Sequence, residues 1–183
     1  MRSATREHHH RIDRLVDLHR MQDRSHYARV LRVFDAFLAT WEPTVWAALP
    51  GRRQWLQARS RRAFLQQDLR DLGVSPAAAN PALPLRTEAA AWGSIYVMEG
   101  SALGGQVITR GLAAAGLHRG YGAAYFHGWG DATGEMWREA RELLHAELAA
   151  DAALADACRA AQRTFDHLSA LFELELHERA PAA

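Results

Sequence analysis

Glycines recur along one face of an apolar segment that the residue pattern predicts to be helical. At about 100° per residue, Gly93, Gly100, Gly104 and Gly111 project within roughly 40° of one another. Each interior glycine costs a helix about 1 kcal/mol relative to alanine, and five glycines lie among the twenty residues 92–111. A partner that lies directly on bare backbone would offset this cost. That partner is either a second helix or a flat ligand, and the choice between them decides the function.

Three consecutive histidines lie near the start of the chain, in a segment that we predict to be a helix. The apolar face of this helix is centred near Ile12, so His8 and His9 flank it and His10 points to solvent. Periodicity does not choose between His8 and His9. Arg2 lies on the side of His9, two turns away, so this histidine could bind iron while the arginine binds a carboxylate a ring's breadth away. For a lone histidine in a helix, the commoner case is a partly buried ring bonded to a backbone carbonyl.

All 22 residues with a permanently basic side chain in this sequence are arginine, and none is lysine. An anion held by a basic side chain here is therefore held by a guanidinium group. The planar fork of that group binds a carboxylate through two parallel hydrogen bonds.

Length and composition exclude several classes of protein. A chain of 183 residues predicts a single domain, 1–183, with a sizeable core. No apolar run approaches the roughly 18 residues of a membrane span, so we expect no membrane partner. The net charge of +1 argues against nucleic-acid binding. The single cysteine, Cys158, excludes an internal disulfide and fits a reducing compartment, and the start of the chain lacks the apolar region of a signal peptide, so we expect a cytoplasmic protein.

The elements that must position these residues are all predicted to be helices, since no segment alternates like a strand. We expect helices over residues 4–18, 25–41 with Ser25 as N-cap, a short stretch after Pro43, 59–72, 87–115, 133–149 and 151–177. Residues 74–84 and 117–130 are rich in proline or glycine and predict loops. The glycines inside 87–115 predict a bend, Gly116 is expected to end that helix, and 179–183 are expected to fray.

The last predicted helix carries an apolar stripe that indicates core packing. The stripe consists of Leu154, Cys158, Ala161, Phe165, Leu168, Phe172 and Leu176. Cys158 is therefore expected to be buried and inert rather than nucleophilic. The sequence contains no Glu-x-x-His motif of a di-iron site, no Walker loop, no G-x-S-x-G elbow and no C-x-x-C pair. No other metal site or nucleophile competes with the histidine helix.

Two segments together resemble the haem (heme) oxygenase family. Residues 4–13, A-T-R-E-H-H-H-R-I-D, are similar to the family's A-T-x-x-x-H-x-x-x-[DE] start, which assigns the iron ligand to His9. Residues 96–107, Y-V-M-E-G-S-A-L-G-G-Q-V, are similar to the family's distal helix, in which a G-x-x-x-G-G element lies flat over the haem. The E-G-S-x-L-G-G form is most similar to bacterial members that supply biliverdin to phytochromes. The order and separation of the two segments also fit the family.

The resemblance implies a fold and a reaction. It implies an all-α, single-domain, haem-oxygenase-like helical bundle with a kinked distal helix, and haem b that serves as both cofactor and substrate. The implied reaction uses O2 and releases biliverdin, CO and ferrous iron. Because the sequence contains no flavin, nicotinamide or iron–sulfur motif, electrons are expected from a ferredoxin- or flavodoxin-type reductase system. A bacteriophytochrome is the implied biliverdin acceptor.

The resemblance also implies roles for individual residues. His9 is the axial ligand of the haem iron, and the backbone at Gly100, Gly104 and Gly105 approaches the ring, with Gly100 and Gly104 making room for oxygen. The haem propionates need cations, and the candidates from the family's positions are Arg2, Arg138 and Arg141, whose alternative is a solvated surface side chain. Tyr96 borders the glycine face and is assigned either a hydrogen bond to a propionate or water, or a packing role.

One departure from the family pattern leaves the source of protons open. Animal members carry an aspartate directly after the first distal glycine, and here that position is Ser101. A hydroxyl can position water but cannot supply the charge of a carboxylate. This departure supports one alternative, a haem carrier or sensor of the same fold with little turnover. The second alternative is a haem-free TenA-like enzyme of the same helical architecture. The second needs a reactive cysteine that faces a pocket, and Cys158 is poorly placed for that role.

Overall fold

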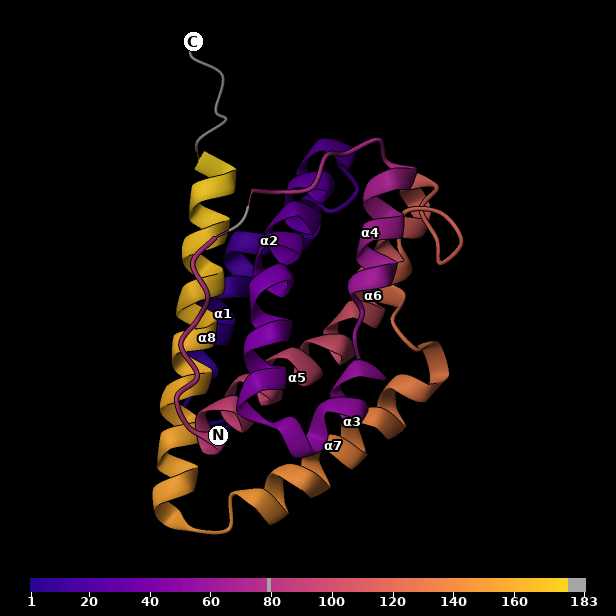
Figure 1. Cartoon of the computed structure of the whole chain (residues 1–183). Helices are drawn as coiled ribbons and strands as arrows, with labels where there is room; N and C mark the ends of the chain where they lie inside the picture. Colours follow the sequence, from indigo (N-terminus) through magenta and orange to yellow (C-terminus); the bar gives the residue numbers. More distant parts are fainter. Residues whose placement is uncertain (79, 178–183) are drawn as a thin grey trace.

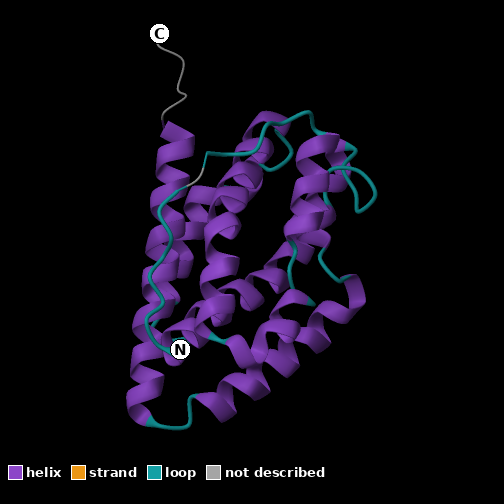
Figure 2. Cartoon of the chain, in the orientation of Figure 1, coloured by secondary structure: helices purple, strands orange, loops and turns teal. Residues whose placement is uncertain are grey.

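The computed structural model describes residues 1–78 and 80–177, and within them every regular element is a helix (Figures 1 and 2). The eight α-helices are α1 Arg6–Val16, α2 Arg24–Ala48, α3 Arg53–Gln57, α4 Arg62–Asp71, α5 Glu88–Leu112, α6 Ala124–His127, α7 Thr133–Glu147 and α8 Asp151–His177. Short 3-10 turns occur at Leu18–Arg20, Pro50–Arg52, Ala113–Ala115 and Gly130–Ala132. The predicted all-α class is confirmed, and the tail expected to fray, 179–183, lies outside the described residues.

The glycine-rich helix, α5, lies at the centre of the fold and packs against α8, α7 and α6 (Figure 1). The Thr87 side chain caps its start by accepting a hydrogen bond of 3.0 Å from the Ala90 N–H. A 3-10 turn and Gly116, at φ +74°, end it as predicted. α5 runs unbroken through its glycines, and the expected bend stays a prediction.

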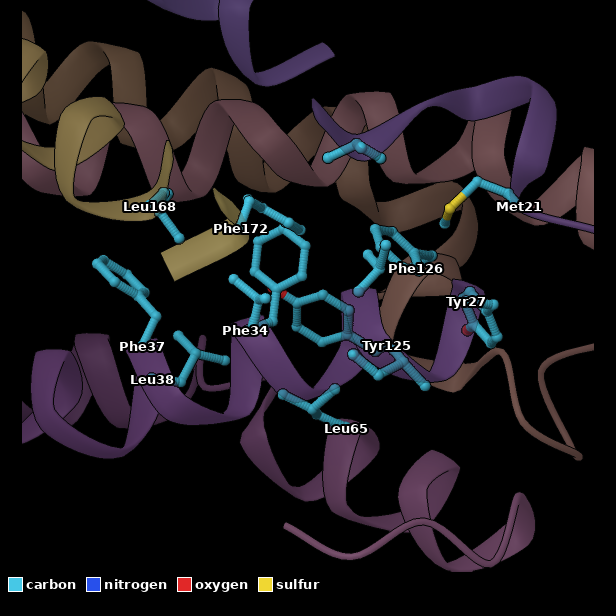
Figure 3. Packing of buried hydrophobic residues seen from close by; sticks show 14 of the residues in the cluster. Met21, Tyr27, Phe34, Phe37, Leu38, Leu65, Tyr125, Phe126, Leu168 and Phe172 are labelled. Atoms are coloured by element: carbon cyan, nitrogen blue, oxygen red, sulfur yellow. The ribbon is translucent and has the colours of Figure 1, made fainter. Parts of the chain in front are cut away.

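An aromatic cluster fills the core between α2, α6 and α8 (Figure 3). The Phe34 ring lies at its centre, 5.1 Å from the Tyr125 ring, 5.8 Å from Phe126 and 5.7 Å from Phe172 between ring centroids. Such edge and offset contacts add to the free energy gained by burying the rings. The cluster fixes α6 and α8 relative to α2.

The second helix differs from its predicted bounds at both ends. Its N-cap is Asp23, whose carboxylate accepts from the N–H groups of Ser25 at 2.9 Å and His26 at 3.4 Å, so the prediction of Ser25 as the cap was wrong. The helix also continues through Pro43 to Ala48 instead of stopping near residue 41. Proline removes one backbone hydrogen bond from a helix interior. The burial of Val45 beyond it favours continuation of the helix.

The helix predicted over 59–72 is present as α4, which begins three residues later than predicted, and a short helix lies in a predicted loop. α3 precedes the predicted segment, and Arg59 and Arg61 lie in the turn between α3 and α4. α6 forms within the predicted loop 117–130, because the Asp68 carboxylate accepts the N–H groups of Ala124 and Tyr125, both at 2.8 Å. Asp68 is fully buried, and burial raises its pKa to about 6.

The apolar stripe of α8 is buried only in part. Phe165, Leu168 and Phe172 are in the core as predicted, but Leu154 is 39% exposed and Cys158 is only half-buried. The prediction was wrong at this end because α5 crosses α8 there at close range. The crossing buries the small side chains Ala157, Ala160 and Ala161, and Leu154 turns away from it.

Candidate functional site

A cavity of about 1140 Å³ lies between the start of α1, the middle of α5 and α7. Its volume slightly exceeds the roughly 300–1,000 Å³ of typical small-molecule sites. The cavity is lined by Met1, Arg2, Ser3, Thr5, Arg6, His9, His10, Tyr96, Val97, Gly100, Leu103, Trp137, Arg141 and Phe165. The structure thus brings together five residues predicted for one site, namely Arg2, His9, Tyr96, Gly100 and Arg141, which come from the segment before α1 and from α1, α5 and α7. The predicted site residues Gly104 and Gly105 do not line this cavity.

The charged side chains on the cavity lining are basic. Arg2 and Arg6 come from the start of the chain and Arg141 comes from α7, and no Asp or Glu is among the lining residues of the described chain. Because arginine stays protonated at any physiological pH, these side chains make the cavity attractive to anions. The rest of the lining is largely apolar, so the cavity suits a ligand with a wide apolar body and an anionic edge.

The two ring nitrogens of His9 differ, because Nδ1 contacts a carboxylate and Nε2 is available to a ligand in the cavity. Its Nδ1 lies 2.9 Å from the Asp13 carboxylate one turn later on α1, and its ring meets the edge of Phe165 at 5.9 Å. A carboxylate at Nδ1 holds the proton on that nitrogen and leaves the lone pair on Nε2. The His9 side chain is 61% exposed, so Nε2 can be reached by a ligand.

The neighbouring histidines differ from His9. The His8 Nε2 lies 3.7 Å from Asp166 on α8, and His8 does not line the cavity. His10 is exposed as predicted, but it also reaches the cavity lining. The structure therefore separates His8 from His9, which periodicity alone does not do.

The glycines of α5 fall into two groups. A Cβ at Gly93 would overlap the backbone of Ala157 in α8, and a Cβ at Gly105 would lie 2.5 Å from the carbonyl oxygen of Phe126. These two glycines are required by helix packing, so Gly105 has a reason to be glycine other than the ring contact assigned to it. A Cβ at Gly104 or Gly111 would meet nothing within 4 Å.

Gly100 belongs with the second group. A Cβ there would meet only the Trp137 ring edge at 3.6 Å, which is an ordinary van der Waals distance. The packing of the described residues therefore leaves room for alanine at Gly100 and Gly104. No contact within the described chain compensates for the roughly 1 kcal/mol that each glycine costs the helix.

Ser101 points away from the cavity. Its hydroxyl donates to the Met98 carbonyl at 2.7 Å and accepts from Arg61 Nη2 at 2.9 Å. Arg61 also donates to the Met98 carbonyl and is itself buried. Ser101 is not among the lining residues, and its hydroxyl is engaged by Arg61 and the Met98 carbonyl instead of facing the cavity.

The two predicted arginines of α7 lie in different surroundings. The Arg141 guanidinium lines the cavity and lies over the Trp137 ring at 6.0 Å. Arg138 is exposed and pairs with Glu135 at 3.3 Å, outside the cavity lining. Of the two, Arg141 alone is placed to meet a ligand in the cavity.

Arg6, Trp137 and Arg59 are among the site residues that were missed from the sequence. Trp137 precedes Arg141 by one helical turn and lines the same cavity, so its spacing was a usable signal. Arg59 lies behind the cavity wall and donates to Glu99 on α5, to Glu139 on α7, both at 2.5 Å, and to the Met136 carbonyl at 3.1 Å. Burial raises the pKa of Glu99, and the nearby Arg59 and Arg61 oppose this rise. No sequence pattern reveals these contacts between distant segments.

Two absences hold for the part of the chain that the structure describes. No group of three or more His, Cys, Asp or Glu side chains there is arranged to hold a metal ion. None of its helices combines the length and the apolar character that crossing a membrane requires.

Comparisons with known proteins point to one family. No protein-family model matches the chain. It is 39% identical over 147 residues to a heme oxygenase of Xanthomonas campestris pv. campestris (strain 8004), an alignment that covers 79% of this chain and 87% of that protein. Its structure is similar to the crystal structure of NO- and CO-bound heme oxygenase from Neisseria meningitidis, with a TM-score of 0.85, 24% identity and coverage of 99% and 92% of the two chains. The second likeness concerns the fold.

Proposed function

The chain belongs to the haem oxygenase family, and we propose that it opens the ring of haem b. Haem is the substrate, and its iron supplies the oxygen chemistry that converts the ring to biliverdin with release of CO and ferrous iron, using O2 and external electrons. The described residues fit this substrate, because the cavity has an apolar body, a basic rim and a histidine with an available Nε2.

The observation that carries the proposal is the pair of unexplained glycines on α5. A Cβ at Gly104 would meet nothing within 4 Å, and one at Gly100 only the Trp137 ring edge at an ordinary contact distance, in a helix that packs tightly at Gly93 and Gly105. A flat ring that lies on bare backbone explains why glycine stands at these two positions. A second helix does not explain them, since no chain segment lies within 4 Å of a Cβ at Gly104 in the described structure.

Each protein group has a role in this proposal. His9 binds the iron through Nε2, and Asp13 orients the imidazole through its contact with Nδ1. Arg2 and Arg141 bind the propionates, with Arg6 as a further cation that the structure adds to the set. Tyr96 lines the cavity beside Gly100 and offers a hydroxyl to a propionate or to water.

A haem carrier or sensor is the second candidate, because the cavity lining in the described chain has no carboxylate and the Ser101 hydroxyl is bound by Arg61. A TenA-like enzyme is disfavoured, because Cys158 lies on α8 and is not among the lining residues. A ferredoxin- or flavodoxin-type electron donor, a bacteriophytochrome as biliverdin acceptor and a cytoplasmic location stay predictions.

Visible spectroscopy tests the proposal. Haemin is added to the purified protein, then ascorbate or ferredoxin with its reductase, in the presence of O2. We expect a Soret band on haemin addition, followed by its loss as a biliverdin band grows. A Soret band that persists under reductant would favour the carrier or sensor, and no spectral change on haemin addition would rule out both haem functions.

A further inference from the structure

The indole of Trp137 closes one end of the glycine face. Trp137 projects from α7 into the cavity, and its six-membered ring lies 3.6 Å from the position of a Cβ at Gly100. It also contacts the Tyr96 ring, 5.7 Å away between centroids. The next open glycine, Gly104, has no such neighbour. A flat ligand that lies on α5 at Gly100 is therefore bounded on one side by the Trp137 ring, whereas no group of the described chain bounds it at Gly104.

The position of the Trp137 indole is fixed by contacts of Arg59 with the backbone and side chains beside it. Arg59 donates to the carbonyl of Met136, which directly precedes Trp137, and to the Glu139 carboxylate, two residues after it. The same guanidinium donates to Glu99, which directly precedes Gly100 on α5. Its stacking on Trp55 at 4.2 Å and a side-chain exposure of only 4% fix it further. Arg59 thus sets the spacing between the Trp137 indole and the Gly100 backbone.

Two more features indicate where on α5 a flat ligand can extend. Leu103 and Val107 project on the same side of α5 as the open glycines and are 38% and 55% exposed, although both are apolar. Leu103 lines the cavity and offers contact to a ring displaced from Gly100 towards Gly104, and Val107 extends this apolar surface one turn beyond the cavity lining. Arg141, one turn after Trp137, lines the cavity at the end that the indole bounds, where its guanidinium can bind an anionic substituent.

We propose that Trp137 is a specificity-determining residue that fixes the in-plane position of the haem ring and thereby decides which meso carbon is oxidised. The inference rests on the proposed function. A porphyrin has four edges that differ in their substituents, and a cation alone holds the propionates without preventing the ring from sliding or turning about that contact. A rigid indole beside the cation restricts this freedom, because every placement in which the ring would overlap the indole is excluded.

Three variants test the inference. Trp137→Ala removes the wall, and Trp137→Phe keeps an aromatic ring but shortens it. Trp129→Phe is the matched control, because Trp129 is also half-buried and contacts Phe64 at 5.0 Å, but it does not line the cavity. The hyperfine-shifted haem methyl signals in the proton NMR spectrum of the ferric protein report ring orientation before any turnover. Chromatography of the biliverdin isomers reports the carbon that is cut.

We expect a single set of methyl signals and one dominant isomer for the wild type and for Trp129→Phe. Trp137→Ala should add a second set of signals and raise the minor isomers about tenfold, the ratio that corresponds to 1.4 kcal/mol, with a smaller change in Trp137→Phe. Unchanged signals and isomers in whichever Trp137 variants bind haemin would overturn the inference. Failure of the wild type to bind haemin or to form biliverdin would instead contradict the proposed function itself.

Discussion

The contact between His9 Nδ1 and the Asp13 carboxylate distinguishes His9 from the two histidines beside it. His10 also reaches the cavity, so the two offer a matched pair of variants. We expect His9→Ala to abolish the normal ferric haem spectrum, because the axial nitrogen is lost, and His10→Ala to leave it intact. Visible spectra of both variants with haemin check this. The reverse pattern would assign the iron ligand to His10.

Arg141 and Arg138 make a second matched pair, one turn apart on α7. Arg141 lines the cavity, and Arg138 pairs with Glu135 at the surface. Loss of a charge-assisted hydrogen bond costs about 1.5–3 kcal/mol, so Arg141→Ala should weaken haemin binding by roughly tenfold or more. Arg138→Ala should leave the dissociation constant unchanged within about twofold, since exposed ion pairs contribute little. Soret titrations measure both, and equal effects would show that neither arginine is selectively a propionate ligand.

At the scale of the element, we predict that alanine has opposite effects on stability at the two groups of glycines in α5. Gly104→Ala should stabilise the haem-free protein by about 0.5–1 kcal/mol, because alanine favours the helix and its methyl group meets open space. Gly100→Ala should do the same, with an ordinary contact to Trp137. Both should weaken haemin binding, since the methyl group lies where the ring approaches the backbone.

Gly105→Ala is the control within the same helix. Its methyl group would lie 2.5 Å from the Phe126 carbonyl oxygen, so this variant should destabilise the haem-free protein. Urea unfolding of the three variants, followed by Soret titration, separates the two effects. A Gly104→Ala variant that is less stable, or that binds haemin as the wild type does, would show that the open glycines serve helix packing.

The sequence predicted the elements that have strong local signals. The N-terminal boundary and the C-terminal glycine of α5 follow from Thr87 and Gly116, and α8 has its predicted bounds. It failed where contacts from distant segments decide the structure. The buried surface beyond Pro43 favours continuation of α2, and α6 depends on the Asp68 carboxylate of another helix. Neither effect is visible in a local pattern.

At the scale of the whole molecule, the site shows the same limit. Residue spacing placed Gly100 and Gly104 on one face, and the family resemblance paired that face with His9. Spacing alone could not tell the open glycines from Gly93 and Gly105, because the difference lies in what α8 and α6 put against them. The wall at Trp137 depends in turn on a buried guanidinium from the turn between α3 and α4.

The stability of the whole molecule should depend on the charge of Asp68. This buried carboxyl joins α4 to α6, and its pKa is raised from 3.8 to about 6 by burial. Between these two values the folded state binds more protons than the unfolded state, so the contribution of Asp68 to the free energy of unfolding is present below pH 3.8 and is lost as the pH rises through about 6. A shift of this size corresponds to a change on the order of 3 kcal/mol.

The variant Asp68→Asn removes the titration but leaves an amide at the same place. Urea unfolding of the wild type and the variant from about pH 4 to about pH 7 should show the wild type losing stability relative to Asp68→Asn as the pH rises across the window of the shifted carboxyl. Asp71→Ala, on the same helix as Asp68, removes the acceptor of the Gly122 N–H and so controls for the loss of a contact to this loop. Carbon NMR of the Asp68 carboxyl group measures its pKa directly. A carboxyl that titrates near its ordinary value in the folded protein would show that the bonds from Ala124 and Tyr125 outweigh the cost of burial.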